Sequence, residues 1–444
     1  MFAILQHATF RKLFLAQVVA LVGTGLATVA LALLAYDIAG AQAGEVLGTA
    51  LAIKMVVYVL LAPMSGALMS PRLRKPVLVA LDVIRAGVVL ALPFVTEIWQ
   101  VYVLIALLQS ASACFTPLFQ SLIPEILPAE GDYTRALSLS RLAYDLESLL
   151  SPMLAAALLT VINFHALFVG TSAGFALSAL LVLTAAFPMA ATSARGRPFD
   201  RAIRGIRIYL HTPRLRGLLA INLIAAAGGA MVFVNTVVIV RSVLGGGDRQ
   251  VAWALAAFGA GSMLVALTLP KLLDCWSDRR VMLTAAGATL LSLIIGSVVW
   301  QVQGGKIAWA LLLPLWAVMG MAYAGLVTPG GRLLRRSAKS DDLPFLFAAQ
   351  FSLSHVCWLI SYPLAGWLGS QFGLGVAFVA LTALAALGLT LALVTWPTRE
   401  MAEIEHRHDD LPEGHPHWIE HGGFPEGAHS HVVHIDEWHQ RWPG

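Results

Sequence analysis

The chain has 444 residues, of which 58% are hydrophobic and only 12% charged, and its formal net charge is +4. Its mean hydropathy of +0.77 lies far above that of a soluble domain, which needs charged side chains to cover its surface. The composition therefore excludes an ordinary soluble protein and predicts a chain that crosses a membrane many times.

Twelve apolar segments follow one another, each long enough to cross a hydrocarbon core of about 30 Å as a helix. Only a helix satisfies its own backbone polar groups in lipid, and the alternating polarity of barrel strands does not occur in these segments. We therefore predict an all-α membrane protein with spans at 10–38, 46–69, 77–95, 99–123, 134–161, 166–187, 215–240, 251–273, 281–302, 307–328, 343–368 and 376–396.

Lysine and arginine gather in alternate loops. If the amino terminus is cytoplasmic, the predicted outside loops hold only Arg241, Arg249 and Lys306, and the inside segments hold most of the other lysines and arginines. Positive charge marks the cytoplasmic side of a membrane protein. The asymmetry predicts that both termini face the cytoplasm.

A long polar stretch, 194–216, interrupts the apolar segments near the middle of the chain. It is rich in arginine and has one acid, and Phe199, Ile203, Ile206 and Leu210 share one face of a helix. This pattern is typical of a basic amphipathic helix on a membrane surface, where arginines meet lipid headgroups rather than nucleic acid. We expect a six-helix unit at 1–190, this linker at 191–214, a second six-helix unit at 215–397 and a tail at 398–444.

The two six-helix units resemble each other. The sequence FRKLFLAQVVALVGTG, from Phe10, aligns with LRGLLAINLIAAAGGA, from Leu215, and the same shift brings Arg74 and Lys75 onto Arg279 and Arg280. Parallel repeats of this kind predict a duplicated transporter unit in which the substrate path runs between two pseudo-symmetric halves.

Three stretches carry a family resemblance: FRKLFLAQVVALVGTGLATVALALLAYDIAG, APMSGALMSPRLRKPVL and LDVIRAG. With them the chain resembles, up to its tail, a major facilitator superfamily transporter, in particular the bacterial exporters related to siderophore and drug efflux proteins. The resemblance implies the twelve-helix major facilitator fold, a monomer in the bacterial inner membrane, transport by alternating access, and no enzymatic activity.

Five residues match the superfamily's signature around the turn between the second and third spans: Gly66, Arg74, Lys75, Asp82 and Arg85. The resemblance implies that they gate transport. Met69, Ser70 and Pro71 stand where the signature usually has an aspartate, but Asp82 and Arg85 are spaced to pair on one helix. The alternative is that the basic residues only fix topology and the glycine only lets helices approach.

Polar groups inside spans are costly in lipid and usually face the protein interior. The candidates for the substrate and proton pathway are Lys54, Asp145, Glu147, Asn222, Asn235 and His355. Asp145 follows Arg141 by four residues and could form a local ion pair, whereas Glu147 has no such neighbour and is the candidate proton carrier. His355 could titrate, bind a metal ion, or serve as a hydrogen-bonded structural group.

The tail is different in kind. It holds nine of the thirteen histidines, three pairs of them spaced as His-x-His: His406, His408, His415, His417, His421, His429, His431, His434 and His439. Its acids, glycines and prolines predict disorder, and imidazole favours nickel, cobalt, copper and zinc. We predict metal binding by the tail, which resembles the histidine-rich ends of nickel and cobalt resistance exporters in the same superfamily; the alternative is a merely polar, pH-sensitive tail.

The sequence has no phosphate-binding Gly-x-x-x-x-Gly-Lys-Ser/Thr loop, so we expect no nucleotide cofactor and take the proton gradient as the energy source. The prediction is a secondary active transporter for proton-coupled efflux of a divalent transition metal, nickel or cobalt first. One alternative is efflux of a siderophore, drug or other small organic molecule. Another is a membrane metal sensor that does not transport.

Overall fold

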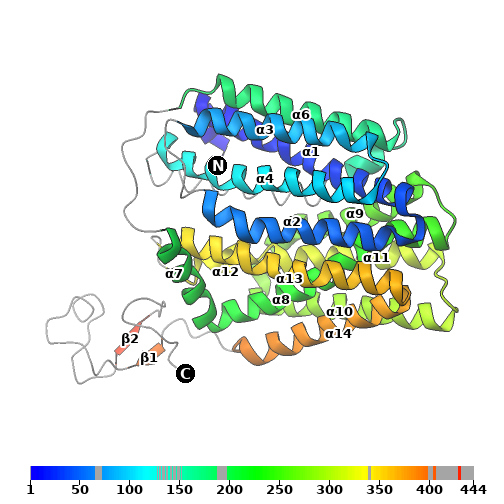
Figure 1. Ribbon diagram of the computed structural model, residues 1–444. Coiled ribbons are helices and arrows are strands. Elements are labelled where there is room, and N and C mark those ends of the chain that lie inside the picture. The colour runs from blue at the N-terminus through cyan, green and yellow to red at the C-terminus, as the bar shows by residue number, and fades with distance from the viewer. Residues whose placement is uncertain are drawn as a thin grey trace.

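The computed structural model describes residues 2–65, 73–127, 153–187, 198–338, 342–398, 404–406 and 429–431, and eight single positions between 128 and 152. Within these residues, eleven α-helices of 18 residues or more run side by side and form one bundle (Figure 1). Ten apolar stretches are long enough to span a membrane, and the first, Ala8–Leu61, contains two of the helices. The predicted all-α membrane fold is therefore confirmed, although most of the predicted fifth span lies outside the described residues.

The amino-terminal half comprises α1 (Ala8–Ala39), α2 (Ala43–Ser65), α3 (Arg74–Ala91), α4 (Ile98–Ile126) and α6 (Phe164–Thr184) in the described part. The carboxyl-terminal half comprises α8 (Pro213–Val238), α9 (Asp248–Cys275), α10 (Asp278–Val302), α11 (Trp309–Val327), α13 (Leu343–Gln371) and α14 (Leu374–Thr395). Shorter elements are η1 (Phe2–Gln6), η2 (Gly40–Gln42), η4 (Leu92–Phe94), α7 (Pro198–His211), the π-helical turn η5 (Ile239–Val243), α12 (Gly330–Arg335), β1 (Ile404–His406) and β2 (His429–His431).

The helices end close to the positions that were predicted from the lengths of the apolar segments. Among the helix ends that the described residues contain, the largest difference is four residues: the third span, predicted to end at 95, ends at Ala91. The outside of the bundle carries exposed apolar side chains such as Leu267, Val302 and Val394, which are 68%, 81% and 79% exposed. Such a surface suits lipid and not water.

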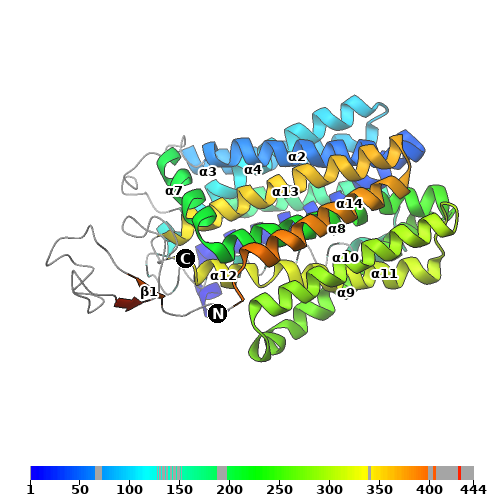
Figure 2. The same cartoon turned by 90° about the horizontal axis from the view of Figure 1, so that it is seen from below.

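The two ends of the bundle differ. The end that carries the amino terminus, α7 and α12 is here called the proximal end, and the end with the turns at 40–42, 244–247, 303–308 and 372–373 is the distal end (Figures 1 and 2). Gly40 and Gly373, at φ 55° and 88°, allow two of the distal turns, because this region of backbone space favours glycine.

The halves meet where α2 packs along α13 and α8 (Figure 1). Near the distal end the two helix backbones come so close that a side chain would not fit: a Cβ on Gly48 would lie 2.7 Å from the Tyr362 carbonyl oxygen, and one on Gly366 would lie 2.2 Å from that of Gly44. Small residues allow this approach, and any larger side chain would push the two halves apart.

Helix α7 lies across the proximal end of the bundle (Figure 2) and packs on α13. Tyr209 is fully buried there and donates a hydrogen bond to Gln350 Oε1, and Arg204 Nε lies 2.7 Å from Asp342 Oδ1. Burial, and secondarily the Cys357 thiol, raises the pKa of Tyr209 well above its ordinary range, so this phenol stays a neutral donor. Ile203 and Leu210 remain 48% and 41% exposed on α7.

Six residues of the tail form two short strands. Strands β1 and β2 pair in antiparallel register, beyond the proximal end of the bundle (Figure 1). The sequence HSHVV places β-branched residues directly after alternating histidines, a composition that favours strand over coil. The rest of the tail from 399 lies outside the described residues.

Candidate transport site

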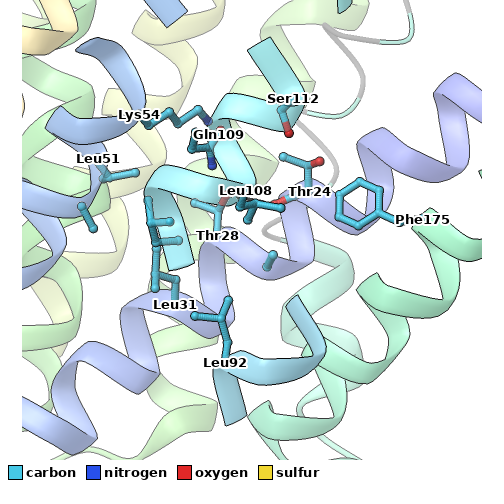
Figure 3. Close-up of a pocket in the computed structure, with 13 residues that line it drawn as sticks. Thr24, Thr28, Leu31, Leu51, Lys54, Leu92, Leu108, Gln109, Ser112 and Phe175 are labelled. Carbon is cyan, nitrogen blue, oxygen red and sulfur yellow. Dashed lines mark hydrogen bonds between the residues drawn. The ribbon is translucent and has the colours of Figure 1, made fainter. Parts of the chain in front are cut away.

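A small cavity opens inside the amino-terminal half, between α1, α2 and α4 (Figure 3). Its volume is about 30 Å³, enough for one or two water molecules. Apolar side chains form most of the lining, and the polar groups are Thr24, Thr28, Lys54, Gln109 and Ser112. These five groups give the cavity polar sides within a mainly apolar bundle.

Lys54, on α2, is the cation of this cavity. Its charge interacts with the carboxylate of Glu147, the predicted proton carrier, which lies on the predicted fifth span. Glu147 also borders α1, since a Cβ on Gly25 would lie 2.9 Å from its Oε1. The fold thus brings Lys54 and Glu147, which are 93 positions apart in the sequence, close enough for their charges to interact inside the amino-terminal half.

Lys54 also faces the other half. Its Nζ lies 5.9 Å from the ring centre of Tyr58, one turn along α2, and that ring stacks on His355 of α13 with centroids 5.4 Å apart and planes 3° apart. The Phe351 ring lies 4.1 Å from His355, whose Nδ1 is 2.6 Å from the Phe351 carbonyl oxygen. This cation and aromatic stack joins the two halves about midway along α2 and α13.

The remaining polar candidates lie elsewhere. Asn222 donates to the Leu218 carbonyl oxygen of its own helix at 2.8 Å. Asn235, near the distal end, donates to the Ala365 carbonyl oxygen at 3.1 Å, and its buried Oδ1 accepts no bond from the described part of the chain. Asp145 lies outside the described residues.

The distal end is closed by polar contacts between the halves. Tyr36 and Ser242 share a hydrogen bond of 3.0 Å, Arg241 pairs with Asp37 at 3.3 Å, and Ser370 donates to Glu45 at 2.7 Å. Arg241 belongs to the π-helical turn η5, whose extra residue per turn is common at functional sites. These contacts, with the glycine crossing of α2 and α13, shut the distal side of the site.

Two of the gating candidates, Asp82 and Arg85, lie in a buried polar network and not at the turn between the helices. Asp82 is fully buried and pairs with Arg85, which confirms that the two residues pair, and Ser178 donates to Asp82 at 2.8 Å. The Arg85 guanidinium lies 4.1 Å from the Phe115 ring centre and 4.5 Å from that of Phe175. All these partners belong to α3, α4 and α6, so the network ties the amino-terminal half together.

The other gating candidates sit at the proximal end. Lys75 donates to the Ala185 carbonyl oxygen at 2.8 Å, and Lys12 donates to that of Thr184. Both lysines therefore satisfy the free carbonyls at the end of α6 and oppose its negative dipole end. Arg74 begins α3, and Gly66 lies outside the described residues.

Three of the predicted tail ligands, His406, His429 and His431, lie in β1 and β2. The other six lie outside the described residues: His408, His415, His417, His421, His434 and His439. Within the described part of the chain, no group of three or more His, Cys, Asp or Glu side chains is arranged to hold a metal ion.

Sequence reasoning missed Tyr58, Gln109 and the close glycine contact. Uncharged polar and aromatic residues are too common in spans to stand out. The spacing Gly44-x-x-x-Gly48 could have indicated a helix contact, because small residues four apart mark close packing in membranes. Tyr58, one turn from Lys54, could have been noticed as a ring within reach of that cation.

A bundle of long apolar helices with charged groups enclosed between two halves defines a polytopic membrane transporter. The sequence model of the Major Facilitator Superfamily matches residues 13–247 and again residues 218–426, so the chain belongs to this family. It is 24% identical to the uncharacterized MFS-type transporter YfiS of Bacillus subtilis (strain 168) over 358 residues, which are 78% of this chain and 82% of that protein.

Solved transporters share the fold at low identity. A mutant of the nucleoside transporter NupG has a TM-score of 0.67 at 14% identity, over 87% of this chain and 98% of that one. A bacterial homolog of the human lysosomal transporter Spinster, in an inward-facing and unoccupied conformation, has a TM-score of 0.64 at 12% identity, over 88% of this chain and 98% of that one. At these identities the likeness establishes the fold alone.

Proposed function

We propose that this chain is a proton-coupled secondary active transporter of the bacterial inner membrane, which works as a monomer with both termini in the cytoplasm. One observation carries the proposal: the charges of Lys54 and Glu147 interact inside the amino-terminal half, beside the Tyr58 and His355 stack that joins the halves. One proton can change this interaction, and a charge change at the contact between halves shifts the equilibrium between facing states.

The site favours an organic cargo over a metal ion. Among described side chains it offers one ammonium, one carboxylate, one imidazole, and amide and hydroxyl groups. Nickel and cobalt are held by several imidazole or thiolate ligands, and Lys54 would repel a divalent cation. The rings of Tyr58, Phe351 and His355 give this contact an aromatic character that suits an organic molecule better than a bare ion. We therefore place a small organic molecule before the divalent metal as cargo.

The direction we propose is efflux, on the strength of the resemblance to exporters. While Glu147 is ionised it balances Lys54 and can accept hydrogen bonds from a cargo with donor groups or one positive charge. Protonation of Glu147 leaves the Lys54 charge unbalanced, which weakens the hold on such a cargo. Proton and cargo then compete for one carboxylate, the condition for proton antiport.

Metal efflux is the second candidate, because nine histidines stand in the tail. Such a tail could concentrate metal ions near the transport site, although the described residues hold no group of three or more metal ligands.

The test is proton movement in vesicles. The purified full chain is reconstituted in proteoliposomes that contain a pH-sensitive dye, and cationic, neutral and anionic aromatic solutes are added, as are Ni²⁺ and Co²⁺. We expect a cationic or neutral aromatic solute to drive proton movement. The rate of this movement should be at least about tenfold lower in Glu147→Gln than in the wild type. Glu97→Gln, on an exposed carboxylate, is the matched control and should behave as the wild type.

The outcomes separate the candidates. Proton movement driven by Ni²⁺ or Co²⁺ and by no organic solute would establish the metal as cargo instead. A chain that moves protons with neither class would contradict transport and favour the sensor.

A further inference from the structure

A groove lies on the outer surface of the amino-terminal half, between α3 and α6, which pack side by side (Figure 1). Its volume is about 450 Å³. One lysine and five apolar residues line it: Lys75, Pro76, Val79, Ala80 and Val83 of α3, and Leu183 of α6. Val83 and Leu183 are 57% and 56% exposed, so this α3–α6 groove opens away from the bundle interior and is separate from the transport site.

The groove has one charged end and an apolar body. Lys75, Val79 and Val83 follow one another at four-residue spacing, so they share one face of α3. Because a helix rises 1.5 Å per residue, Val83 lies about 12 Å along the helix from Lys75. Helix α3 begins at Arg74, so the charged end of the groove is at the proximal end of the bundle and the apolar body extends toward the middle of the membrane. This arrangement suits a molecule with an ionic head and an apolar chain.

Two ammonium groups meet at the charged end. Lys75 Nζ donates to the Ala185 carbonyl oxygen and Lys12 Nζ to that of Thr184, each at 2.8 Å, so the two lysines bond to consecutive residues. The Lys75 ammonium also lies 5.6 Å from the ring centre of Phe187, and its side chain is half-buried. These partners carry no charge, and an ammonium has three N–H donors. Both lysines can therefore bind an anion at this end of the groove without leaving their carbonyl oxygens.

We propose that the α3–α6 groove binds one anionic phospholipid, with its phosphate at Lys12 and Lys75 and one acyl chain along Val79, Val83 and Leu183. Charge complementarity selects this occupant, since basic pockets at the ends of membrane helices bind anionic lipid headgroups. A zwitterionic lipid would gain less from the two lysines, and a free phosphate would gain nothing from the apolar body. The site does not depend on the proposed cargo or on proton coupling.

The first experiment measures lipid affinity of the full-length protein in detergent by native mass spectrometry. Phosphatidylglycerol should bind at least about fivefold more tightly than phosphatidylcholine with the same chains, and Lys12→Gln and Lys75→Gln should each weaken phosphatidylglycerol binding about fivefold. Lys271→Gln, at an exposed lysine near the proximal end of α9, is the matched control and should bind as the wild type does.

Three results would overturn the proposal. Equal affinity for the two lipids would mean that the groove does not recognise an anion. Equal loss in Lys271→Gln would mean that the lipid responds to overall charge. Competition by glycerol phosphate as strong as that by phosphatidylglycerol would mean that the lysines bind a phosphate group without a lipid chain.

The second experiment tests the groove without changing any charge. Val83→Trp fills the apolar body and should weaken phosphatidylglycerol binding severalfold. Ile84→Trp places the same ring at the next residue, which is 47% exposed and does not line the groove, and should leave the affinity unchanged. Both changes replace an exposed side chain, so neither disturbs the core of the bundle. If the two variants bind the lipid equally well, the acyl chain does not occupy the groove and the proposal is wrong.

Discussion

Lys54 and Arg85 are both cations inside the amino-terminal half, but their surroundings give them different tasks. Arg85 meets Asp82, Phe115 and Phe175, all within its own half. The charge of Lys54 interacts with that of Glu147 in its own half, and Lys54 is linked through the Tyr58 ring to His355 of the other half. Only the second arrangement can change when the halves move, so we assign structure to Arg85 and coupling to Lys54.

The charge pair of Lys54 and Glu147 can be tested without knowing the cargo. Removal of either charge leaves the other without its partner inside the bundle, whereas removal of both removes the imbalance. Lys54→Met and Glu147→Gln should each lower the thermal midpoint of the purified protein, and the double variant should recover much of the loss. Additive losses would mean that the two charges do not interact.

The Asp82 network predicts a different pattern. Arg85→Ala leaves fully buried Asp82 without its cation and should cost about 3–5 kcal/mol of unfolding free energy. Arg332, whose side chain is 44% exposed, shares Asp278 with Arg336. Arg332→Ala should therefore cost at most about 1 kcal/mol. Denaturation of both variants in the same detergent provides the comparison, and equal losses would argue against a structural network at Arg85.

The cost of charge in lipid made several site residues predictable. It indicated Lys54, Glu147 and His355, and the structure brings these three together. The same reasoning gave Asn222 and Asn235 equal weight, yet both bond to backbone carbonyls. An amide in a span can donate to a backbone carbonyl of its own or of a neighbouring helix, so a sequence does not distinguish an amide that lines a site from one that bonds to the backbone.

At the scale of elements, helix positions follow from apolar length, but helix contacts do not. A span of about 20 apolar residues predicts a helix whatever its neighbours are. The close crossing of α2 and α13 depends on Gly48 meeting Tyr362 and on Gly366 meeting Gly44. A glycine in one span indicates close packing without identifying its partner.

The close contact between α2 and α13 predicts what holds the distal end of the bundle closed. A Cβ on Gly366 would lie 2.2 Å from the Gly44 carbonyl oxygen, so Gly366→Ala should separate the helices and weaken the closed state. Cysteines at Glu45 and Ser370, which are hydrogen-bonded, should cross-link readily, and Gly366→Ala should slow that reaction severalfold.

Gly287→Ala is the matched control, because a Cβ there meets no other group within 4 Å. It should leave the cross-linking rate as it is. Equal rates in all three backgrounds would show that the glycine contact does not hold the distal end closed.

At the scale of the whole molecule, the internal repeat predicted two halves with a site between them, and the cation and aromatic stack lies at their contact. The sequence could not predict which end is closed, because both facing states have the same sequence and differ by only a few kcal/mol. It could not predict the register of β1 and β2 either, since short polar strands pair only weakly.

The central claim is that Glu147 links proton movement to cargo movement. The vesicle test above first identifies a cargo. The most direct measurement then uses Glu147→Gln in proteoliposomes and compares two kinds of transport. One is the exchange of labelled for unlabelled cargo, and the other is the accumulation of cargo driven by a pH gradient. We predict that exchange persists while gradient-driven accumulation falls to the level of empty vesicles. Full gradient-driven accumulation by Glu147→Gln would contradict the account and place coupling at another residue.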